Sequence, residues 1–591
     1  MRETKKMTQA NWISRLLLAT VAALLLASTA YAATPGISGP VFNLTAQAAY
    51  LNMPDGEAVY SWGYGCNGAA TFASTLGGVS FPNATCPTMQ VPGPTLIVHE
   101  GDSVTVNLVN GLPTAAGNTS ILFPGFQVAT SRAGVAGLLA REAVPGGTVT
   151  YLFTATAPGT HAYYSGTQGD LQVEMGLYGA IVVLPAHVPA NCTTGYHSSN
   201  LTAQAHWGES DFRLSQAAYD HPGSCYDREY LFQWAEMDPR IHKQALAEVA
   251  DPVRVAACAA TTATKPGCNL DVQTEPYHPA YFLINGRCMP DLMDPNYAAE
   301  YPHQPYNGNP HMHPGELTLI RTVGQGRWQH PFHEHANHVR ILARDGNLVL
   351  SSSTTPISYT TPGGTPVSGP PLAGLLMFNT DTTPGQAFDG IFYFTGRGLN
   401  WDPYGHHAPL TGTTAGTPAS DPIGDGSATL PCTPDVNGYN TGAPTAINYF
   451  EWCQDHDKPV QVNPFGDVAA GGPVTLPDPN VFTNGPWYGG TAYLGPDASL
   501  RATMETCVGS PYGTPNPTTL SGGPGTPAVN TASCTTSLPS NTQANPANER
   551  GWAFMWHSHN EREITTNNVF PGGMLMMMLV DSREFVIDES L

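Results

Sequence analysis

Apolar and polar residues alternate along several short segments in the first third of this chain, a pattern typical of half-buried β-strands. The segment QVPGPTLIVHEGDSVTVNLVNGLP (residues 90–113) predicts a turn and two strands, with alternating apolar side chains at Leu96, Val98, Val104, Val106 and Leu108. Residues 146–166 and 174–185 continue the same pattern. Together these segments predict one β-sandwich over residues 33–188.

A second series of strands follows, with apolar segments at residues 225–238, 281–291, 315–346, 384–398, 551–559 and 572–580. Residues 399–550 interrupt this series with a stretch that is rich in Thr, Pro, Gly and Asn and has few apolar runs. We interpret this stretch as a long loop insertion within a second sandwich over residues 189–591, with a small third domain as the alternative. The predicted fold class is therefore all-β.

The composition favours strands and turns over helices. Only 12% of the 591 residues are charged, and the 62 Gly and 54 Pro make up about a fifth of the chain. The formal net charge is −22, and it becomes −25 without residues 1–32, which carry four positive charges and one negative charge. Such a surface repels nucleic acid and anionic lipid, so we expect neither as a partner.

The N-terminal residues have the features of an export signal. Basic residues precede the apolar run LLLATVAALLLASTA, and residues 30–32 (AYA) offer small side chains for cleavage before Ala33. The run is short for a membrane span, which takes roughly 20 residues. We predict a signal peptide at residues 1–32 and an exported protein, periplasmic or extracellular, with no membrane span; a membrane anchor is the alternative.

The 11 Cys of an exported protein are expected to form disulfides. Neighbours in the sequence give four candidate pairs: Cys66/Cys86, Cys258/Cys268, Cys432/Cys453 and Cys507/Cys534. The odd count leaves at least one thiol unpaired, and the sequence does not indicate which one.

Four segments resemble signatures of the multicopper oxidase superfamily, whose domains are cupredoxin sandwiches: VPGPTLIVHEGDSVTV (residues 91–106), GLYGAIVVLP (176–185), HPFHEH (330–335) and GWAFMWHSH (551–559). The resemblance implies two cupredoxin-like Greek-key β-sandwich domains. In that superfamily, four His-x-His pairs hold three coppers that reduce dioxygen to water. A fourth copper, bound by His, Cys and His and usually a weak axial Met, passes electrons from the substrate to the other three.

The first two histidine pairs are missing at the positions that the resemblance implies. Leu122 and Pro124 stand at the first pair, and Tyr164 and Gly166 stand at the second. The domain of residues 33–188 is therefore expected to keep the fold without copper ligands. Nearby His161 is interpreted as an ordinary core or surface histidine.

The third and fourth pairs are intact, as His333 with His335 and His557 with His559. His330 matches a ligand of the electron-transfer copper, but Ser558 stands at the cysteine of that site and Glu563 at its second histidine. A serine hydroxyl stays protonated near neutral pH and cannot replace a thiolate. We therefore expect the electron-transfer site to be absent or strongly altered.

Residues two apart on a strand point to the same face, so two paired strands would bring the four intact histidines together. Neutral imidazoles suit Cu(II), Zn(II) and Ni(II), and the Irving–Williams order favours copper. The predicted metal ligands are His333, His335, His557, His559 and, by resemblance, His330. The alternative is a hydrogen-bonded histidine cluster without metal. If the strand continues, Glu561 would face the metal as a ligand or catalytic base; otherwise it is a surface carboxylate.

Two other motifs have simpler interpretations. Residues 311–313 (HMH) lie in a stretch rich in Pro and Gly and are interpreted as a loop feature. Met574, Met576 and Met578 share one face of a predicted strand, with Met577 on the other, and are interpreted as core residues.

The sequence thus predicts an exported, copper-binding, multicopper-oxidase-like oxidoreductase. A mononuclear or reduced copper site would act on metal ions or small-molecule reductants, with dioxygen as a further candidate partner. Two alternatives remain: a copper-binding or copper-buffering protein without catalysis, and a metal-free structural scaffold. A homo-oligomer is also left open.

Overall fold

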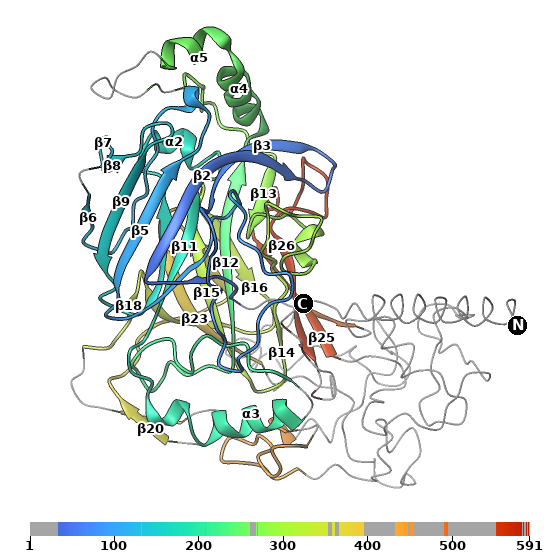
Figure 1. Cartoon of the computed structure of the whole chain (residues 1–591). Helices are drawn as coiled ribbons and strands as arrows, with labels where there is room; N and C mark the ends of the chain where they lie inside the picture. The colour runs from blue at the N-terminus through green and yellow to red at the C-terminus, as the bar shows by residue number, and fades with distance from the viewer. Residues whose placement is uncertain are drawn as a thin grey trace, which may run out of the picture.

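The computed structural model describes residues 34–131, 133–206, 209–259, 268, 270–352, 357–360, 366–394, 432–446, 449–453, 490–493, 551–581, 583, 587 and 589. Most described residues lie in two β-sandwiches, and the all-β fold class is confirmed (Figure 1). The predicted signal peptide, most of the 399–550 insertion and the Cys507/Cys534 pair lie outside the described residues. Among the described residues, no helix has the length and apolar character needed to cross a membrane.

The first sandwich consists of a four-stranded and a five-stranded sheet. The four-stranded sheet has the order β1 (Ile37–Ser38), β4 (Leu96–His99), β11 (Tyr178–Leu184), β10 (Gly159–Tyr164). The other has the order β3 (Ala58–Cys66), β2 (Val41–Asn52), β5 (Ser103–Asn110), β9 (Thr148–Thr154), β6 (Ala129–Thr130). The alternating residues predicted to face inward are buried, Val104, Val106 and Leu108 among them.

The second sandwich also consists of two sheets, which have seven and six strands. One sheet has the order β13 (Tyr281–Ile284), β12 (Arg228–Met237), β15 (Leu317–Gly324), β23 (Ala387–Tyr393), β17 (Val339–Arg344), β18 (Asn347–Leu348). The other has the order β14 (His311–Met312), β26 (Leu575–Asp581), β25 (Gly551–Ser558), β16 (His330–Glu334), β22 (Asn379–Thr382). Their shared core includes Phe332, Trp556, Met574, Met576 and Met578, so the interpretation of these methionines as core residues is confirmed.

Short elements complete the described chain. The edge strands are β21 (Leu376–Met377), which pairs with β17, and β24 (Gly490–Tyr493), which pairs with β25. The hairpins are β7 (Val135–Ala136) with β8 (Arg141–Glu142), and β19 (Ile357–Thr360) with β20 (Pro366–Gly369). The helices are η1 (Thr114–Ala116), α2 (Gly169–Gln172), η2 (Ala190–Cys192), α3 (Tyr196–His206), α4 (Pro239–Ala250), α5 (Pro252–Ala259) and η3 (Asp291–Met293).

Helices α4 and α5 lie between β12 and β13 of the second sandwich in the chain, but they pack against the first sandwich. Asp238 caps α4 by accepting a hydrogen bond from the backbone N–H of Arg240, and Pro239 supplies a favourable first residue. Ile241 and Ala245 of α4 then pack into the core of the first sandwich, and the helix pair lies beside β3 (Figure 1). Strand β11 of the first sandwich ends at Leu184 and β12 of the second begins at Arg228, and α4, from the later segment, packs into the core of the first sandwich.

Three predicted disulfides form: Cys66–Cys86, Cys258–Cys268 and Cys432–Cys453. A fourth, Cys192–Cys225, joins residues 33 positions apart and was not among the predicted pairs, whose members lie closer together in the sequence. Cys288 is a buried free thiol.

Candidate metal centre

Strands β16 and β25 bring the histidine pairs together. The two strands are antiparallel, with His333 directly opposite His557. Strand alternation then places His335 on the same face as His333. The ring centroid of His333 lies 4.7 Å from that of His335, 5.3 Å from that of His557 and 4.8 Å from that of His559.

The surroundings of His333 and His557 favour the neutral imidazole, which is the form that binds metals. Burial, followed by the charge of the neighbouring His335, lowers the pKa of His333 to about 4, and burial also lowers the pKa of His557. Both rings are therefore neutral near pH 7. The Nδ1 atom of His333 lies 2.6 Å from the carbonyl oxygen of Phe378. The Nδ1 atom of His557 lies 2.7 Å from the carbonyl oxygen of Ser558. If each Nδ1 donates its proton to the carbonyl, each Nε2 keeps a lone pair for a ligand.

The donor atoms fit one metal ion. One ring nitrogen from each of His333, His335 and His557 lies within 4.8 Å of the other two. The Nε2 atoms of His335 and His557 are 3.3 Å apart. Two imidazoles about 2.0–2.1 Å from one tetrahedral ion require a nitrogen separation of about 3.3–3.4 Å. Three neutral nitrogen donors suit copper or zinc.

Two other predicted residues lie at the edge of this centre. His559 is exposed, and its ring centroid lies 5.6 Å from that of His557. Strand β25 ends at Ser558, so Glu561 lies in the following turn, where it is exposed. The strand continuation on which the catalytic prediction for Glu561 depended does not occur.

His330 lies apart from the cluster, contrary to the prediction from resemblance. It is three residues before His333, so strand alternation turns it to the core face with Phe332. Both of its ring nitrogens are engaged: Nε2 lies 2.9 Å from Oε2 of Glu236, and Nδ1 lies 2.8 Å from Oε2 of Glu563. We call Glu236, His330 and Glu563 the carboxylate clamp.

The carboxylate clamp lies at the residues that match the electron-transfer site. The Ser558 hydroxyl donates a hydrogen bond to Oε2 of Glu563 at 2.5 Å. Ser558, which stands at the position of the cysteine ligand, is therefore hydrogen-bonded to a carboxylate. Burial alone would lower the pKa of His330, but hydrogen bonds and charge from Glu236 and Glu563 raise it to about 9. The expected loss of electron-transfer copper ligands is thus accompanied by a buried ionic network. The sequence revealed Glu563 at a ligand position but gave no signal for Glu236 on β12.

The carboxylate clamp should make the free energy of unfolding decrease as the pH rises into the alkaline range. Because the folded-state pKa of His330 is about 9 and its ordinary value is 6.5, its contribution is full below about pH 6.5 and lost as the pH rises through 9. The contribution is about 3 kcal/mol. Urea unfolding should show a difference between wild type and His330→Gln that shrinks across this interval. A difference that stays constant would contradict the prediction.

In the first sandwich, the positions of the missing histidine pairs are adjacent and filled. Leu122 and Tyr164 form an antiparallel bridge. The Leu122 side chain occupies the space beside Gly166, where an added Cβ would lie 2.7 Å from it. His161 is buried, with its ring centroid 4.7 Å from that of Phe126, which agrees with its interpretation as a core residue.

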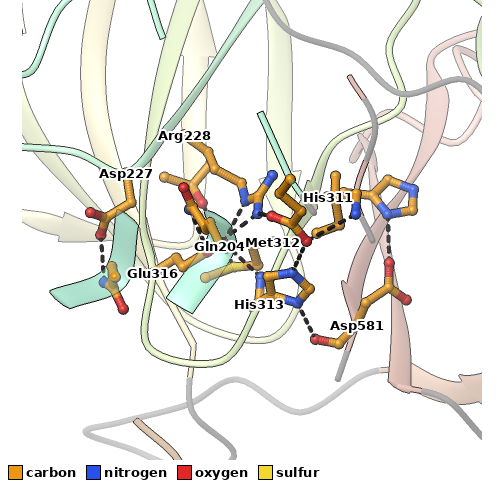
Figure 2. A network of polar contacts seen from close by, with 12 residues as sticks. Gln204, Asp227, Arg228, His311, Met312, His313, Glu316 and Asp581 are labelled. Carbon is orange, nitrogen blue, oxygen red and sulfur yellow. Dashed lines mark hydrogen bonds and ion pairs between the residues drawn. The ribbon is translucent and has the colours of Figure 1, made fainter. Parts of the chain in front are cut away.

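A second polar cluster surrounds Arg228 in the second sandwich (Figure 2). The guanidinium pairs with three buried carboxylates, those of Glu209 at 2.6 Å, Glu316 at 2.5 Å and Glu589 at 2.9 Å. His313 contacts Glu209, and together with Glu316 these residues are close enough to suggest a metal site. However, Arg228 already supplies the cation that these carboxylates need, so we interpret the cluster as structural.

The interpretation of residues 311–313 as a loop feature was wrong. His311 and Met312 form β14, which pairs with β26. Nδ1 of His311 lies 2.8 Å from Asp581, and Nδ1 of His313 lies 2.8 Å from the carbonyl oxygen of the same residue. The buried contacts with distant Asp581, 270 positions away from His311, could not be read from the local Pro/Gly-rich sequence.

The described residues thus form two β-sandwiches, the second of which carries the histidine-bearing strands. The sequence profile of a family described as multicopper oxidase matches residues 82–187. The chain is 41% identical over 97 residues to a copper-containing nitrite reductase of Pseudomonas chlororaphis, covering 16% of this chain and 25% of that protein. It is 38% identical over 114 residues to the multicopper oxidase MCE of Talaromyces pinophilus, covering 19% of this chain and 18% of that protein. Residues 82–187 are thus similar to the multicopper oxidase family.

The matched segments span a quarter or less of the length of these two relatives. Among solved structures, the multicopper oxidase mgLAC is 17% identical, with a TM-score of 0.34 over 59% of this chain and 74% of that chain. The profile match falls within the first sandwich, whose residues at the ligand positions are Leu122, Pro124, Tyr164 and Gly166. This similarity therefore does not by itself assign copper chemistry to the second sandwich.

Proposed function

We propose that this chain is an exported copper-binding oxidoreductase with one mononuclear centre formed by His333, His335 and His557. The observation that carries the proposal is the convergence of three ring nitrogens from two paired strands. The Irving–Williams order favours copper over the other divalent ions that suit this donor set. The copper-containing nitrite reductase and the multicopper oxidase among the relatives support the same metal.

The residues define what such a centre can do. His333 and His557 are held by backbone carbonyls, so their rings need little reorganisation on binding. His335 is only partly buried and His559 is exposed, which leaves one side of the centre accessible to a metal ion or a small reductant. Bound copper would supply one-electron redox chemistry and a coordination position for that reductant. Dioxygen is the proposed electron acceptor.

The four-electron route of the superfamily is not part of this proposal. Leu122, Pro124 and Gly166 have no donor side chain for a three-copper site. Ser558 and the carboxylate clamp occupy the positions of the cysteine and histidine ligands of the electron-transfer copper. The same clamp favours a second candidate function, copper binding without catalysis, because it removes the residues that would bring in electrons from an outside reductant.

Copper loading tests the proposed centre. The full exported chain should bind about one Cu(II) at this centre, with a spin-resonance spectrum of nitrogen ligands and no intense blue thiolate band. Oxygen uptake with phenols, Mn(II) or Fe(II) then separates the oxidoreductase from the binding protein. Absence of copper after loading would refute both, and an intense blue band would refute the assignment of Ser558 and the carboxylate clamp.

The export proposal has a separate test. Expression of the complete chain with its own N-terminal residues should yield a secreted or periplasmic protein that begins at Ala33. N-terminal sequencing of the recovered protein decides the matter, because a retained residue 1 would contradict cleavage.

A further inference from the structure

A row of three side chains crosses the sheet next to the histidine centre. Met555 on β25 is directly opposite Met577 on β26, and His557 is directly opposite Leu575. On the other side of β25, the backbone N–H of His335 donates to the carbonyl of Met555 at 3.4 Å. The register that pairs His333 with His557 therefore also places His335 beside Met555. His335, Met555 and Met577 form what we call the thioether row.

The thioether row lies on the same sheet face as the histidine centre. Met555 is two residues before His557, which gives both side chains the same direction about 7 Å apart. Met574, Met576 and Met578 point the other way and are fully buried in the core. Met555 and Met577 are only partly buried. These two methionines are therefore outside the core of the sandwich, unlike Met574, Met576 and Met578.

The chemistry of this pair differs from that of the imidazole centre. Side chains opposite one another on paired strands have Cβ atoms about 4.5–5.5 Å apart. Methionine has three rotatable side-chain bonds, so the two sulfur atoms can turn toward one ion. Thioethers are soft ligands that select monovalent copper, whereas three imidazoles suit a divalent ion.

We propose that Met555 and Met577 bind Cu(I), with His335 at the end of the same row linking this site to the histidine centre. The two sulfur atoms hold the ion on the face of the sheet where both methionines are partly exposed. A Cu(I) ion that leaves them meets His335, a shared neighbour of both groups. The binding step stands on the methionine pair alone, while delivery to the histidine centre rests on the proposed function.

Silver titration of the full chain tests the binding step, because Ag(I) is a soft monovalent ion that does not change its oxidation state. In protein labelled with ¹³C at the methionine methyl groups, the signals of Met555 and Met577 should shift first on addition of Ag(I). Single Met555→Leu and Met577→Leu variants assign these two signals. The double variant should bind Ag(I) about tenfold more weakly or worse, which corresponds to about 1.4 kcal/mol.

Met576→Leu is the matched control, since it makes the same change on the core face of β26. Exchange of Leu and Met is well tolerated, and thermal unfolding confirms that each variant is folded. The control should keep wild-type Ag(I) affinity. Equal Ag(I) affinity in wild type and the double variant, or first shifts at other methionines, would overturn the proposal.

Cu(II) loading separates this site from the histidine centre. The Met555→Leu/Met577→Leu variant should still take up Cu(II) with the wild-type spin-resonance spectrum. Loss of Cu(II) uptake in the double variant would show that the two groups are one site and would overturn the proposal of a separate soft-metal site. If wild type takes up no Cu(II) while the silver shifts persist, the histidine centre fails and the thioether site stands.

Discussion

His557→Ala should reduce Cu(II) affinity about 100-fold or more relative to the wild-type chain, and His333→Ala should do the same. Loss of a residue that merely supports a ligand already costs about 10–100-fold in metal affinity, and each of these substitutions removes a donor itself. The three nitrogens lie within 4.8 Å of one another, so each substitution removes one of three donors that converge on one position. Competition against a copper chelator measures the affinities, and spin resonance counts the remaining nitrogen ligands.

His338→Ala is the matched control for these substitutions. This histidine lies just after the same motif, with its ring centroid 5.1 Å from that of Phe378, and it is not part of the three-nitrogen group. Its replacement should leave the copper affinity unchanged. Wild-type affinity in both His333→Ala and His557→Ala would show that copper binds elsewhere. Oxygen uptake that survives both substitutions would show that this centre is not catalytic.

Arg228→Met should destabilise the chain by about 3 to 5 kcal/mol, since it leaves three carboxylates buried without their cation. Glu209, Glu316 and Glu589 come from distant parts of the chain, and all three are almost completely buried. Burial raises the pKa of Glu589 to about 7 even with Arg228 beside it. The midpoint of urea unfolding, followed by tryptophan fluorescence, measures the loss.

Lys243→Met gives the matched comparison for Arg228→Met. Lys243 pairs with Glu57 at 3.0 Å, but both side chains are substantially exposed. Exposed ion pairs contribute about 0–1 kcal/mol, so this variant should unfold close to wild type. Similar midpoints for the two variants would contradict a supporting role for the buried network. Through Glu589 the network also joins a residue that lies 361 positions after Arg228 to β12.

The residues of the electron-transfer position show how a ligand set can be replaced without losing the fold. Ser558, His330 and Glu563 remain in contact, joined by hydrogen bonds. Glu236 supplies the second carboxylate from the opposite sheet. A positive imidazolium between two carboxylates satisfies buried groups that would otherwise be costly. The carboxylate clamp therefore preserves the packing of the two sheets.

Local sequence patterns were sufficient for the elements and for part of the site. Alternation of Val104, Val106 and Leu108 predicted their burial, because a strand has a period of two wherever it lies. The same period, applied within each His-x-His pair, predicted that both rings share a face. It also determined that His330, an odd number of residues from His333, faces the other way, although the prediction from resemblance overlooked this.

Only the tertiary structure decided which distant residues complete these patterns. The register of β16 against β25 placed His333 opposite His557, 224 positions later in the chain. The register of β25 against β26 selected Met577 as the partner of Met555, and the packing of the two sheets brought Glu236 to His330. Strand pairing and burial depend on contacts between segments far apart in the sequence, which no local periodicity encodes.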